Sequence, residues 1–188
     1  VLGDLGGRGP VRRSGARPGD VVAHAGVRGR SAAGHALLAG DVDPDSVTGG
    51  AALVAGYRRP SCPLAAGPLA ADAGATAMLD VSDGLLRDAG RIAAASGVVL
   101  DLAEPAGVFP EDLALLAPAA DRLGVDPRTW LLAGGEDHGL LATFPEGRVP
   151  EPFREIGRVL APGPGTPAGT VLVAGAEPGI GPGWDHFG

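Results

Sequence analysis

The clearest pattern along the chain is an apolar segment that turns polar over five residues and then becomes apolar again. The first part, Ala77-Met78-Leu79, is short and typical of a buried strand. From Leu85 to Ser96, apolar residues recur at helical spacing, which predicts a helix with one buried face. The segment Asp80–Gly84 is therefore expected where a strand ends and a helix begins, a place where backbone N–H groups are unpaired.

Other segments carry the patterns of short strands and helices. Strands are expected at 20–25, 98–102, 140–144, 158–160 and 170–174. Helices are expected at 31–39, from 46 or 48 to about 57, at 64–72 with an interruption at Gly67-Pro68, at 111–123 with a break at Pro118, and at 150–155. Because the two kinds of element do not alternate regularly, the pattern favours an α+β fold over a doubly wound sheet.

Composition bounds the possible functions. The 188 residues are 45% hydrophobic, which is enough for one domain, or one domain plus part of another. The net charge is −7 and there is no lysine, which excludes a P-loop nucleotide site. Dispersed arginines and 4% aromatic residues argue against a nucleic-acid surface. Cys62 is the only cysteine, which excludes an internal disulfide, and no apolar run approaches the length of a membrane span, so we expect a cytoplasmic protein.

Two carboxylates and a hydroxyl lie at the predicted strand-to-helix junction. Asp80 and Asp83 are three residues apart and repel each other unless a cation lies between them. Mg²⁺ holding a phosphate would resolve this conflict, since Mg²⁺ prefers one or two carboxylates plus phosphate oxygens. Alternatively, Ser82 or Asp83 simply caps the helix, and Asp80 is a turn residue.

A second polar group, Gly134-Gly135-Glu136-Asp137, follows an apolar segment and precedes a predicted strand. The glycines allow the backbone to approach a ligand, and the carboxylates can bind a metal or a donor-rich ligand. The alternative is an ordinary acidic turn. The loop Gly26–Ser31 either cradles a phosphate at a helix N-terminus or only turns the chain. His24 and His35 have apolar spacing and are expected to be core or surface residues rather than ligands.

Taken together, these motifs resemble the thiamine-monophosphate kinase family of the aminoimidazole-ribonucleotide-synthetase-like superfamily. The resemblance covers nearly the whole chain, and its matching segments are 2–4, 13–20, 31–34, 74–86, 96–98, 134–137 and 183–187. It implies an α+β domain with a mixed sheet and flanking helices at residues 20–188. Residues 1–19 then correspond to the end of an N-terminal domain that binds ATP and metal, through which the family forms homodimers. One departure is His138-Gly139, where the family usually has Tyr-Glu.

The activity that the resemblance implies is ATP-dependent phosphorylation of thiamine monophosphate to thiamine diphosphate. The residues that match family positions are Asp80 and Asp83 for Mg²⁺, Arg13 and Ser82 for ATP, and Glu136 and Trp184 for the substrate. The attacking group is a phosphate oxygen whose second pKa is about 6, so no general base is expected. Since most of the family's magnesium sites lie upstream, these 188 residues alone are expected to be inactive. The alternatives are another ATP-dependent synthetase of the superfamily, or a non-catalytic ligand-binding or interaction domain.

Overall fold

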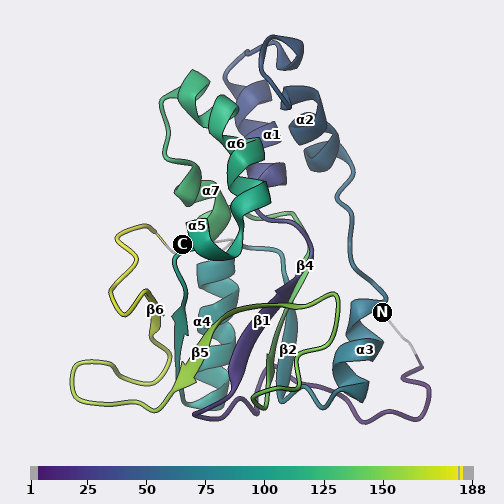
Figure 1. The fold of residues 1–188 in the computed structure, drawn as a ribbon, viewed down its shortest axis with the longest axis vertical. Coiled ribbons are helices and arrows are strands. Elements are labelled where there is room, and N and C mark those ends of the chain that lie inside the picture. The colour runs from purple at the N-terminus through teal and green to yellow at the C-terminus, as the bar shows by residue number, and fades with distance from the viewer. Residues whose placement is uncertain (1–3, 182, 184–188) are drawn as a thin grey trace.

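The computed structural model describes residues 4–181 and 183 (Figure 1). The strands are β1 (Val21–Ala25), β2 (Ala77–Val81), β3 (Val99–Leu102), β4 (Gly139–Phe144), β5 (Arg154–Leu160) and β6 (Val171–Val173). The helices are α1 (Arg30–Ala39), α2 (Gly50–Arg58), α3 (Ala66–Asp72), α4 (Leu85–Ser96), α5 (Pro105–Val108), α6 (Pro110–Leu123) and α7 (Pro127–Ala133), and a 3-10 turn covers Pro44–Ser46.

The strands of the described residues form one six-stranded sheet in the order β2-β4-β1-β5-β3-β6. Neighbouring strands are antiparallel except β3 and β6, which are parallel. In the register of the central strands, Ala23 pairs with Ala142 of β4, and Leu79 of β2 pairs with Leu141. The sheet is therefore mixed, and the expected α+β class is confirmed.

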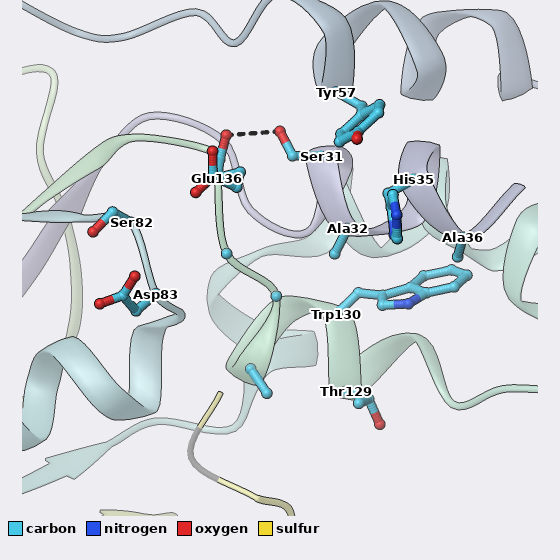
Figure 2. A pocket seen from close by; sticks show the side chains of 13 residues that line it. Ser31, Ala32, His35, Ala36, Tyr57, Ser82, Asp83, Thr129, Trp130 and Glu136 are labelled. Carbon is cyan, nitrogen blue, oxygen red and sulfur yellow. Dashed lines mark hydrogen bonds between the residues drawn. The ribbon is translucent and has the colours of Figure 1, made fainter. Parts of the chain in front are cut away.

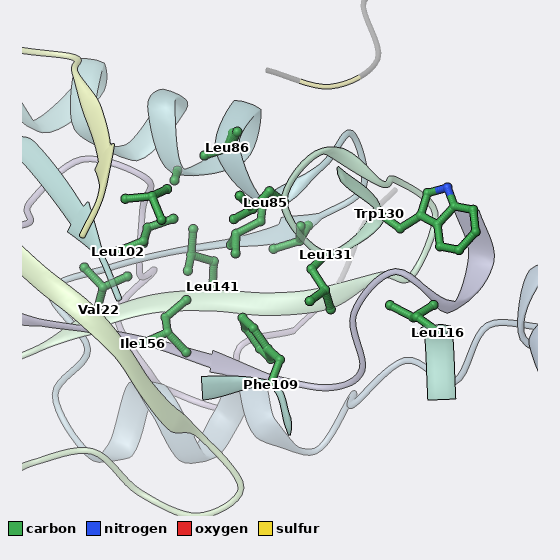
Figure 3. Packing of buried hydrophobic residues seen from close by; sticks show 14 of the residues in the cluster. Val22, Leu85, Leu86, Leu102, Phe109, Leu116, Trp130, Leu131, Leu141 and Ile156 are labelled. Atoms are coloured by element: carbon green, nitrogen blue, oxygen red, sulfur yellow. The ribbon is translucent and has the colours of Figure 1, made fainter. Parts of the chain in front are cut away.

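Alternate residues of the strands point to opposite faces of the sheet, and each face has its own core. On one face, Leu141 and Ala77 pack with the apolar side of α4, where Leu85 is 1% exposed. Figure 3 shows Leu85 on the same side as Leu102 and Leu141. On the other face, Phe144 packs with α3. Complete burial of a leucine side chain stabilises the fold by about 1.5–3 kcal/mol, so α4 is held firmly against the sheet.

A group of helices extends beyond one end of the sheet. In Figure 1, α1, α2, α6 and α7 gather above the strands, whereas α4 runs along the sheet. Helix α1 contacts α2, α6 and α7, so it lies at the centre of this group. No helix in the part of the chain that the structure describes is long and apolar enough to cross a membrane.

Three expectations about local structure are wrong. Helix α3 runs from Ala66 to Asp72 without the expected interruption at Gly67-Pro68, because a proline in the first turn of a helix removes no intrahelical hydrogen bond. The helix expected at 150–155 is absent, and β5 begins within that range at Arg154. Pro152 restricts the residue before it to extended conformations, which disfavours a helix there. Helix α6 continues through Pro118 without a break. Proline leaves the carbonyl of the residue four positions earlier unpaired, and that residue, Ala114, is exposed, so water can satisfy it.

Residues 4–18 form no regular element, and most of them are exposed. They are nevertheless attached to the sheet, because the Met78 N–H of the edge strand β2 donates to the Arg12 carbonyl at 2.9 Å. The Gly15 and Ala16 N–H groups both donate to the Ser96 hydroxyl at 3.2 Å. The expected division of the chain at residues 19 and 20 stays a prediction.

Candidate functional site

The predicted strand-to-helix junction is confirmed. Asp80 is the penultimate residue of β2, and α4 begins at Leu85. The position before the helix is taken by Gly84, with φ at 112°, so the alternative in which Ser82 or Asp83 caps the helix is wrong. The Asp83 N–H instead donates to the carboxylate of Asp88, one turn into α4, at 3.0 Å.

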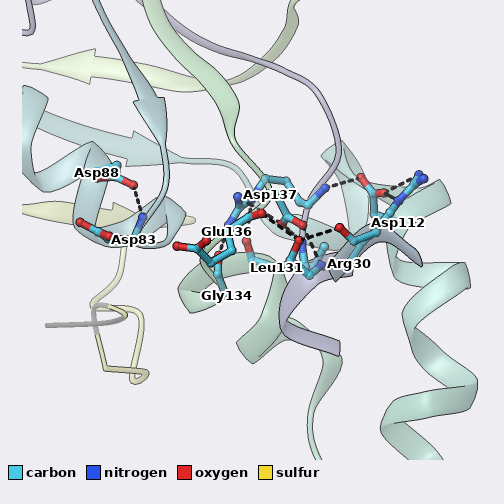
Figure 4. Close-up of polar contacts among 12 residues, drawn as sticks. Arg30, Asp83, Asp88, Asp112, Leu131, Gly134, Glu136 and Asp137 are labelled. Atoms are coloured by element: carbon cyan, nitrogen blue, oxygen red, sulfur yellow. Dashed lines mark hydrogen bonds and ion pairs between the residues drawn. The ribbon is translucent and has the colours of Figure 1, made fainter. Parts of the chain in front are cut away.

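The Asp83 carboxylate is held by an arginine of α4. Arg91 Nη2 lies 2.6 Å from Asp83 Oδ2, and Arg91 Nη1 lies 2.6 Å from Asp88 Oδ1. The hydrogen bond to Asp83 is the main reason that the pKa of Arg91 is raised, and burial raises the pKa of Asp88. Figure 4 shows Asp83 and Asp88 side by side at the start of the helix. The Asp83 side chain therefore has a fixed position at the junction.

The two polar segments of the sequence lie against each other through their backbones. The Glu136 N–H donates to the Ser82 carbonyl at 2.8 Å. A methyl group on Gly135 would overlap the Ser82 carbonyl, and one on Gly84 would overlap the Ala133 carbonyl. Glycine is thus required on both segments for this close approach of backbone to backbone, whereas the sequence analysis expected the glycines to admit a ligand.

Asp137 is buried and hydrogen-bonded within the protein, so its carboxylate is not available to a ligand. It is 1% exposed, and its carboxylate accepts from the Gly29 N–H at 2.5 Å and the Ser31 N–H at 2.8 Å. These are the unpaired groups at the N-terminus of α1, so Asp137 caps that helix from outside. The interpretation of Gly26–Ser31 as a phosphate cradle is wrong, because the protein's own carboxylate occupies the place.

A buried arginine ties the same loop together. Arg28 is fully buried, and its Nη2 donates to the Gly134 carbonyl at 2.6 Å. Its Nη1 lies 3.4 Å from Asp137 Oδ2, and its Nε donates to the Leu131 carbonyl at 3.3 Å. Burial lowers the pKa of Arg28, and the nearby Asp137 opposes that change. The cluster in Figure 4 fixes the loop that carries Glu136.

Asp80, Glu136 and His138 form an exposed group at the surface of the junction. The two carboxylate side chains are 61% and 67% exposed. His138 lies between them, with Nδ1 3.9 Å from Asp80 Oδ2 and Nε2 3.6 Å from Glu136 Oε2. These separations exceed hydrogen-bond length. The His138 side chain is 35% exposed, so it is not a core residue, and it makes no hydrogen bond to either carboxylate.

A pocket of about 560 Å³ lies next to both polar segments (Figure 2). Three predicted site residues line it: Ser82, Asp83 and Glu136. Trp130 of α7 also lines the pocket, and sequence reasoning missed it. The sequence offered one indication, because Trp130 lies only four residues before Gly134. A tryptophan in an apolar segment is, however, more typical of a buried core than of a ligand pocket.

One predicted site residue, Arg13, is not brought into this arrangement, and another cannot be placed. The Arg13 carbonyl lies 3.4 Å from the Ser96 hydroxyl, at the C-terminal end of α4, whereas Ser82 precedes its N-terminal end. A 12-residue helix is about 18 Å long, so the backbone of Arg13 lies well away from Ser82. Trp184 lies outside the described residues. Its neighbour Gly183 packs against the Asp83 carbonyl, at the rim of the site.

The side-chain oxygens at the junction could bind Mg²⁺ only if a bound phosphate and water supplied further ligands. No group of three or more His, Cys, Asp or Glu side chains that could hold a metal occurs among residues 4–181 and 183. The exposed Asp80 carboxylate, the Ser82 hydroxyl and the Asp83 carboxylate match the partial ligand set of Mg²⁺, which takes its other ligands from phosphate and water. The ion pair with Arg91 already commits part of the Asp83 carboxylate.

Comparison with known sequences finds relatives along the full chain, although no protein-family model matches. The chain is 48% identical over 188 residues to thiamine-monophosphate kinase of Mycobacterium tuberculosis, covering 100% of this chain and 53% of the relative. It is 34% identical over 168 residues to thiamine-monophosphate kinase of Escherichia coli, covering 80% of this chain and 48% of that protein. The chain thus spans about half the length of the curated relatives it matches.

Solved structures give the same picture. AaThiL complexed with AMPPCP and TMP matches 94% of this chain and 54% of its own, with a TM-score of 0.77 and 32% identity. Thiamine-monophosphate kinase from Stenotrophomonas maltophilia has a TM-score of 0.71 and 27% identity over 89% of this chain and 54% of its own. The hydrogenase maturation protein HypE, at 20% identity and a TM-score of 0.63, shows the fold alone.

Proposed function

The chain is homologous to thiamine-monophosphate kinases along its whole length, and we propose that it forms part of an enzyme that phosphorylates thiamine monophosphate with ATP. The products are thiamine diphosphate and ADP. The observation that carries the proposal is the joined pair of segments 80–84 and 134–137, which meet through the Glu136–Ser82 backbone hydrogen bond. The related AaThiL, with a TM-score of 0.77, is described in complex with AMPPCP and TMP, which supports the same pair of ligands here.

The proposed reaction needs no general base. The attacking atom is an oxygen of the thiamine phosphate, already largely anionic at neutral pH because its second pKa is about 6. The difficulty is to bring two polyanions together in line, so catalysis depends mainly on positioning and on stabilising charge. A magnesium ion, when bound, supplies positive charge between the phosphates.

We assign the residues at the junction as follows. Asp80 and Asp83 hold Mg²⁺, Ser82 contacts the ATP phosphates, and Glu136 contacts thiamine monophosphate. Arg91 keeps the Asp83 carboxylate in place at 2.6 Å. The two carboxylates differ, since the Asp80 side chain is 61% exposed and Asp83 is anchored by Arg91.

Arg13 and Trp184 are proposed as contacts to ATP and to the substrate on the strength of the motif match alone. Gly183, the last described residue, lies beside the Asp83 carbonyl.

The chain covers 53% of its Mycobacterium tuberculosis relative, so we propose that catalysis needs the remaining part of the kinase as well. That part is proposed to carry most of the ATP and magnesium contacts and the surface through which two copies dimerise. A cytoplasmic location is proposed on the same basis, because thiamine diphosphate synthesis consumes ATP.

The activity is tested on the whole kinase that contains this chain. With ATP and Mg²⁺, thiamine monophosphate should be converted to thiamine diphosphate, identified by chromatography of the product. Thiamine, which lacks the phosphate nucleophile, should serve poorly as an acceptor under the same conditions. ATP turnover with no thiamine diphosphate formed, or equal turnover of both acceptors, would contradict the proposal.

A further inference from the structure

One buried carboxylate at the junction has no part in the roles assigned above. Asp88 of α4 is 0% exposed, and it does not line the pocket. We propose that Asp88 is a positioning residue, which acts through Arg91 to keep the Asp83 carboxylate available to Mg²⁺ bound with ATP. The inference rests on the proposed function, because it concerns how one of the carboxylates assigned there is prepared for its ligand.

Asp83, Asp88 and Arg91 form a closed ring of contacts at the start of α4. The Asp83 N–H donates to Asp88 Oδ2 at 3.0 Å, and Figure 4 shows this hydrogen bond as a dashed line. Arg91 Nη1 donates to Asp88 Oδ1 at 2.6 Å. Arg91 Nη2 lies 2.6 Å from Asp83 Oδ2, which closes the ring. Asp88 therefore fixes the backbone of Asp83 directly and its side chain through the guanidinium.

Arg91 divides its guanidinium between two carboxylates. Its shortest contacts to Asp83 and Asp88 come from different nitrogens. An arginine facing a single carboxylate prefers a fork of two parallel N–H···O bonds to both oxygens. Because Asp88 accepts from Nη1, the guanidinium is held away from such a fork with Asp83. Without the charge of Asp88, Arg91 would turn toward both oxygens of Asp83, the atoms that the proposed assignment gives to Mg²⁺.

The charge of the ring points the same way. Two carboxylates and one guanidinium leave the ring negative, so it attracts a cation together with the exposed Asp80 carboxylate. Loss of the Asp88 charge would leave the ring neutral. Since Asp88 is buried, its charge is screened by solvent less than a surface charge is. Both the geometry and the charge of Asp88 therefore favour a metal ion at Asp83.

A purely structural role for Asp88 is the main alternative, since a side chain that accepts from an N–H at the start of a helix also stabilises the helix. Asp112, which is 4% exposed, offers a matched control. Its carboxylate accepts from the Arg28 N–H at 3.2 Å and from Arg30 Nε at 2.9 Å, so it has the same kinds of partner. None of these partners is a carboxylate assigned to Mg²⁺. We therefore expect its loss to change stability and not the binding of metal.

The experiment uses the whole kinase and measures binding of the ATP analogue AMPPCP by calorimetry at a series of Mg²⁺ concentrations. Asp88→Asn keeps an oxygen for the Asp83 N–H but loses the charge that holds Arg91. It should raise the Mg²⁺ concentration needed for half-maximal binding at least about tenfold, as is typical when a residue that orients a metal ligand is lost. Asp112→Asn should lower the Tm and leave the Mg²⁺ requirement unchanged.

A second substitution separates competition by Arg91 from a simple loss of structure. Arg91→Gln changes a side chain that is 38% exposed, and by itself it should raise the Mg²⁺ requirement less than Asp88→Asn does. Added to Asp88→Asn, it should recover most of the loss, because the guanidinium that competes for Asp83 is gone. Two substitutions that only weaken a helix cap would instead have losses that add.

The outcomes separate this inference from the proposed function. Formation of thiamine diphosphate by the unaltered kinase decides the function, whatever the variants do. A lower Tm in both Asp88→Asn and Asp112→Asn, with the Mg²⁺ requirement unchanged in both, would make Asp88 a structural cap and overturn the inference. A double variant that needs as much Mg²⁺ as Asp88→Asn, or more, would overturn it too, since Arg91 would then not compete with the metal.

Discussion

At the scale of single residues, some carboxylates of the site are exposed and can contact a ligand, whereas others are hydrogen-bonded within the protein and stabilise the backbone. Asp80 and Glu136 are exposed carboxylates on the two joined segments. Asp83 is anchored by Arg91. Asp137, next to Glu136 in the sequence, is buried and serves the N-terminus of α1. Neighbouring carboxylates in one motif thus have opposite roles, and substitutions should affect either catalysis or stability accordingly.

The first prediction concerns the proposed metal ligands. In the whole kinase, Asp80→Asn should lower kcat at least about tenfold and raise the Mg²⁺ concentration needed for half-maximal rate, because under the proposed assignment it removes one carboxylate that would hold Mg²⁺. Asp83→Asn should do the same and should also lower the Tm, since it breaks the ion pair with Arg91. Rates measured across a Mg²⁺ titration, together with thermal unfolding, check both effects. A loss of stability with an unchanged Mg²⁺ requirement would mean that both aspartates are structural.

His24 should make the fold sensitive to acid. The side chain is 2% exposed, and its two ring nitrogens have no hydrogen-bond partner among the described residues. Burial, together with the charges of Arg28 and Arg154, lowers the pKa of His24 well below the usual 6.5. Below pH 6.5 the unfolded chain therefore binds a proton that the folded chain does not, and stability falls as the pH falls.

The measurement is the free energy of unfolding in urea at pH values from about 7.5 to about 5. This window spans the usual pKa of histidine. Because of His24 alone, the free energy of unfolding of the unaltered chain should fall by up to about 1.4 kcal/mol for each pH unit below about 6.5. His24→Leu should lack that component, while His35→Ala, which replaces an exposed histidine, should keep it. Parallel pH profiles for His24→Leu and the unaltered chain would show that His24 does not contribute.

At the scale of elements, the site depends on how closely loops can approach. β2, the turn after it and α4 present Asp80 to Asp83, and the loop between α7 and β4 lies directly against that turn. Only glycine fits at the points of contact, Gly84 and Gly135. The residues that cap the N-termini of α4 and α1 therefore shape the site and also stabilise the fold.

Gly84→Ala should be much more harmful than an alanine at the other end of the same helix. Gly84 has φ at 112°, and an added methyl group would lie 2.6 Å from the Ala133 carbonyl oxygen. Gly97 also has a positive φ, at 69°, but has no atom within 4 Å of an added methyl group. We expect Gly97→Ala to cost about 1 kcal/mol and Gly84→Ala at least about twice that, measured by urea unfolding. Equal losses would mean that the turn moves freely away from the loop.

Removing Asp137 should destabilise the fold more than removing an ordinary helix cap. Asp137→Ala leaves two N–H groups of α1 and the buried guanidinium of Arg28 without their carboxylate, a type of loss that costs about 3–5 kcal/mol. The matched control is Asp126→Ala, since Asp126 caps α7 through the Arg128 N–H at the surface. That change should cost about 1 kcal/mol. Similar unfolding energies for the two variants would contradict a central role for Asp137.

At the scale of the whole molecule, local pattern and long-range contact contribute differently to what can be predicted. The strand-to-helix junction at Asp80–Gly84 follows directly from the change of pattern around it. The cap of α1 does not, because the Asp137 carboxylate and the Ser31 N–H are 106 residues apart and meet only in the folded chain. Trp130 could not be identified as a pocket residue, because the sequence does not show that α1, α2 and α7 converge.

The length of the relatives is the basis of our proposal that part of the site lies outside these 188 residues. The chain matches 53% of the Mycobacterium tuberculosis relative, and its acidic residues form no metal cluster by themselves within residues 4–181 and 183. We propose that the joined segments 80–84 and 134–137 form one side of a phosphoryl-transfer site that other residues of the kinase complete. We accordingly expect the 188 residues alone to show no measurable turnover.

The most direct test of the central claim follows the phosphoryl group itself. ATP labelled at the γ-phosphate is incubated with thiamine monophosphate and Mg²⁺, once with the whole kinase and once with the 188-residue chain. The account predicts that the label appears in thiamine diphosphate with the whole kinase and stays in ATP with the chain alone. Label found only in inorganic phosphate or in another acceptor, or rapid labelling of thiamine diphosphate by the chain alone, would contradict it.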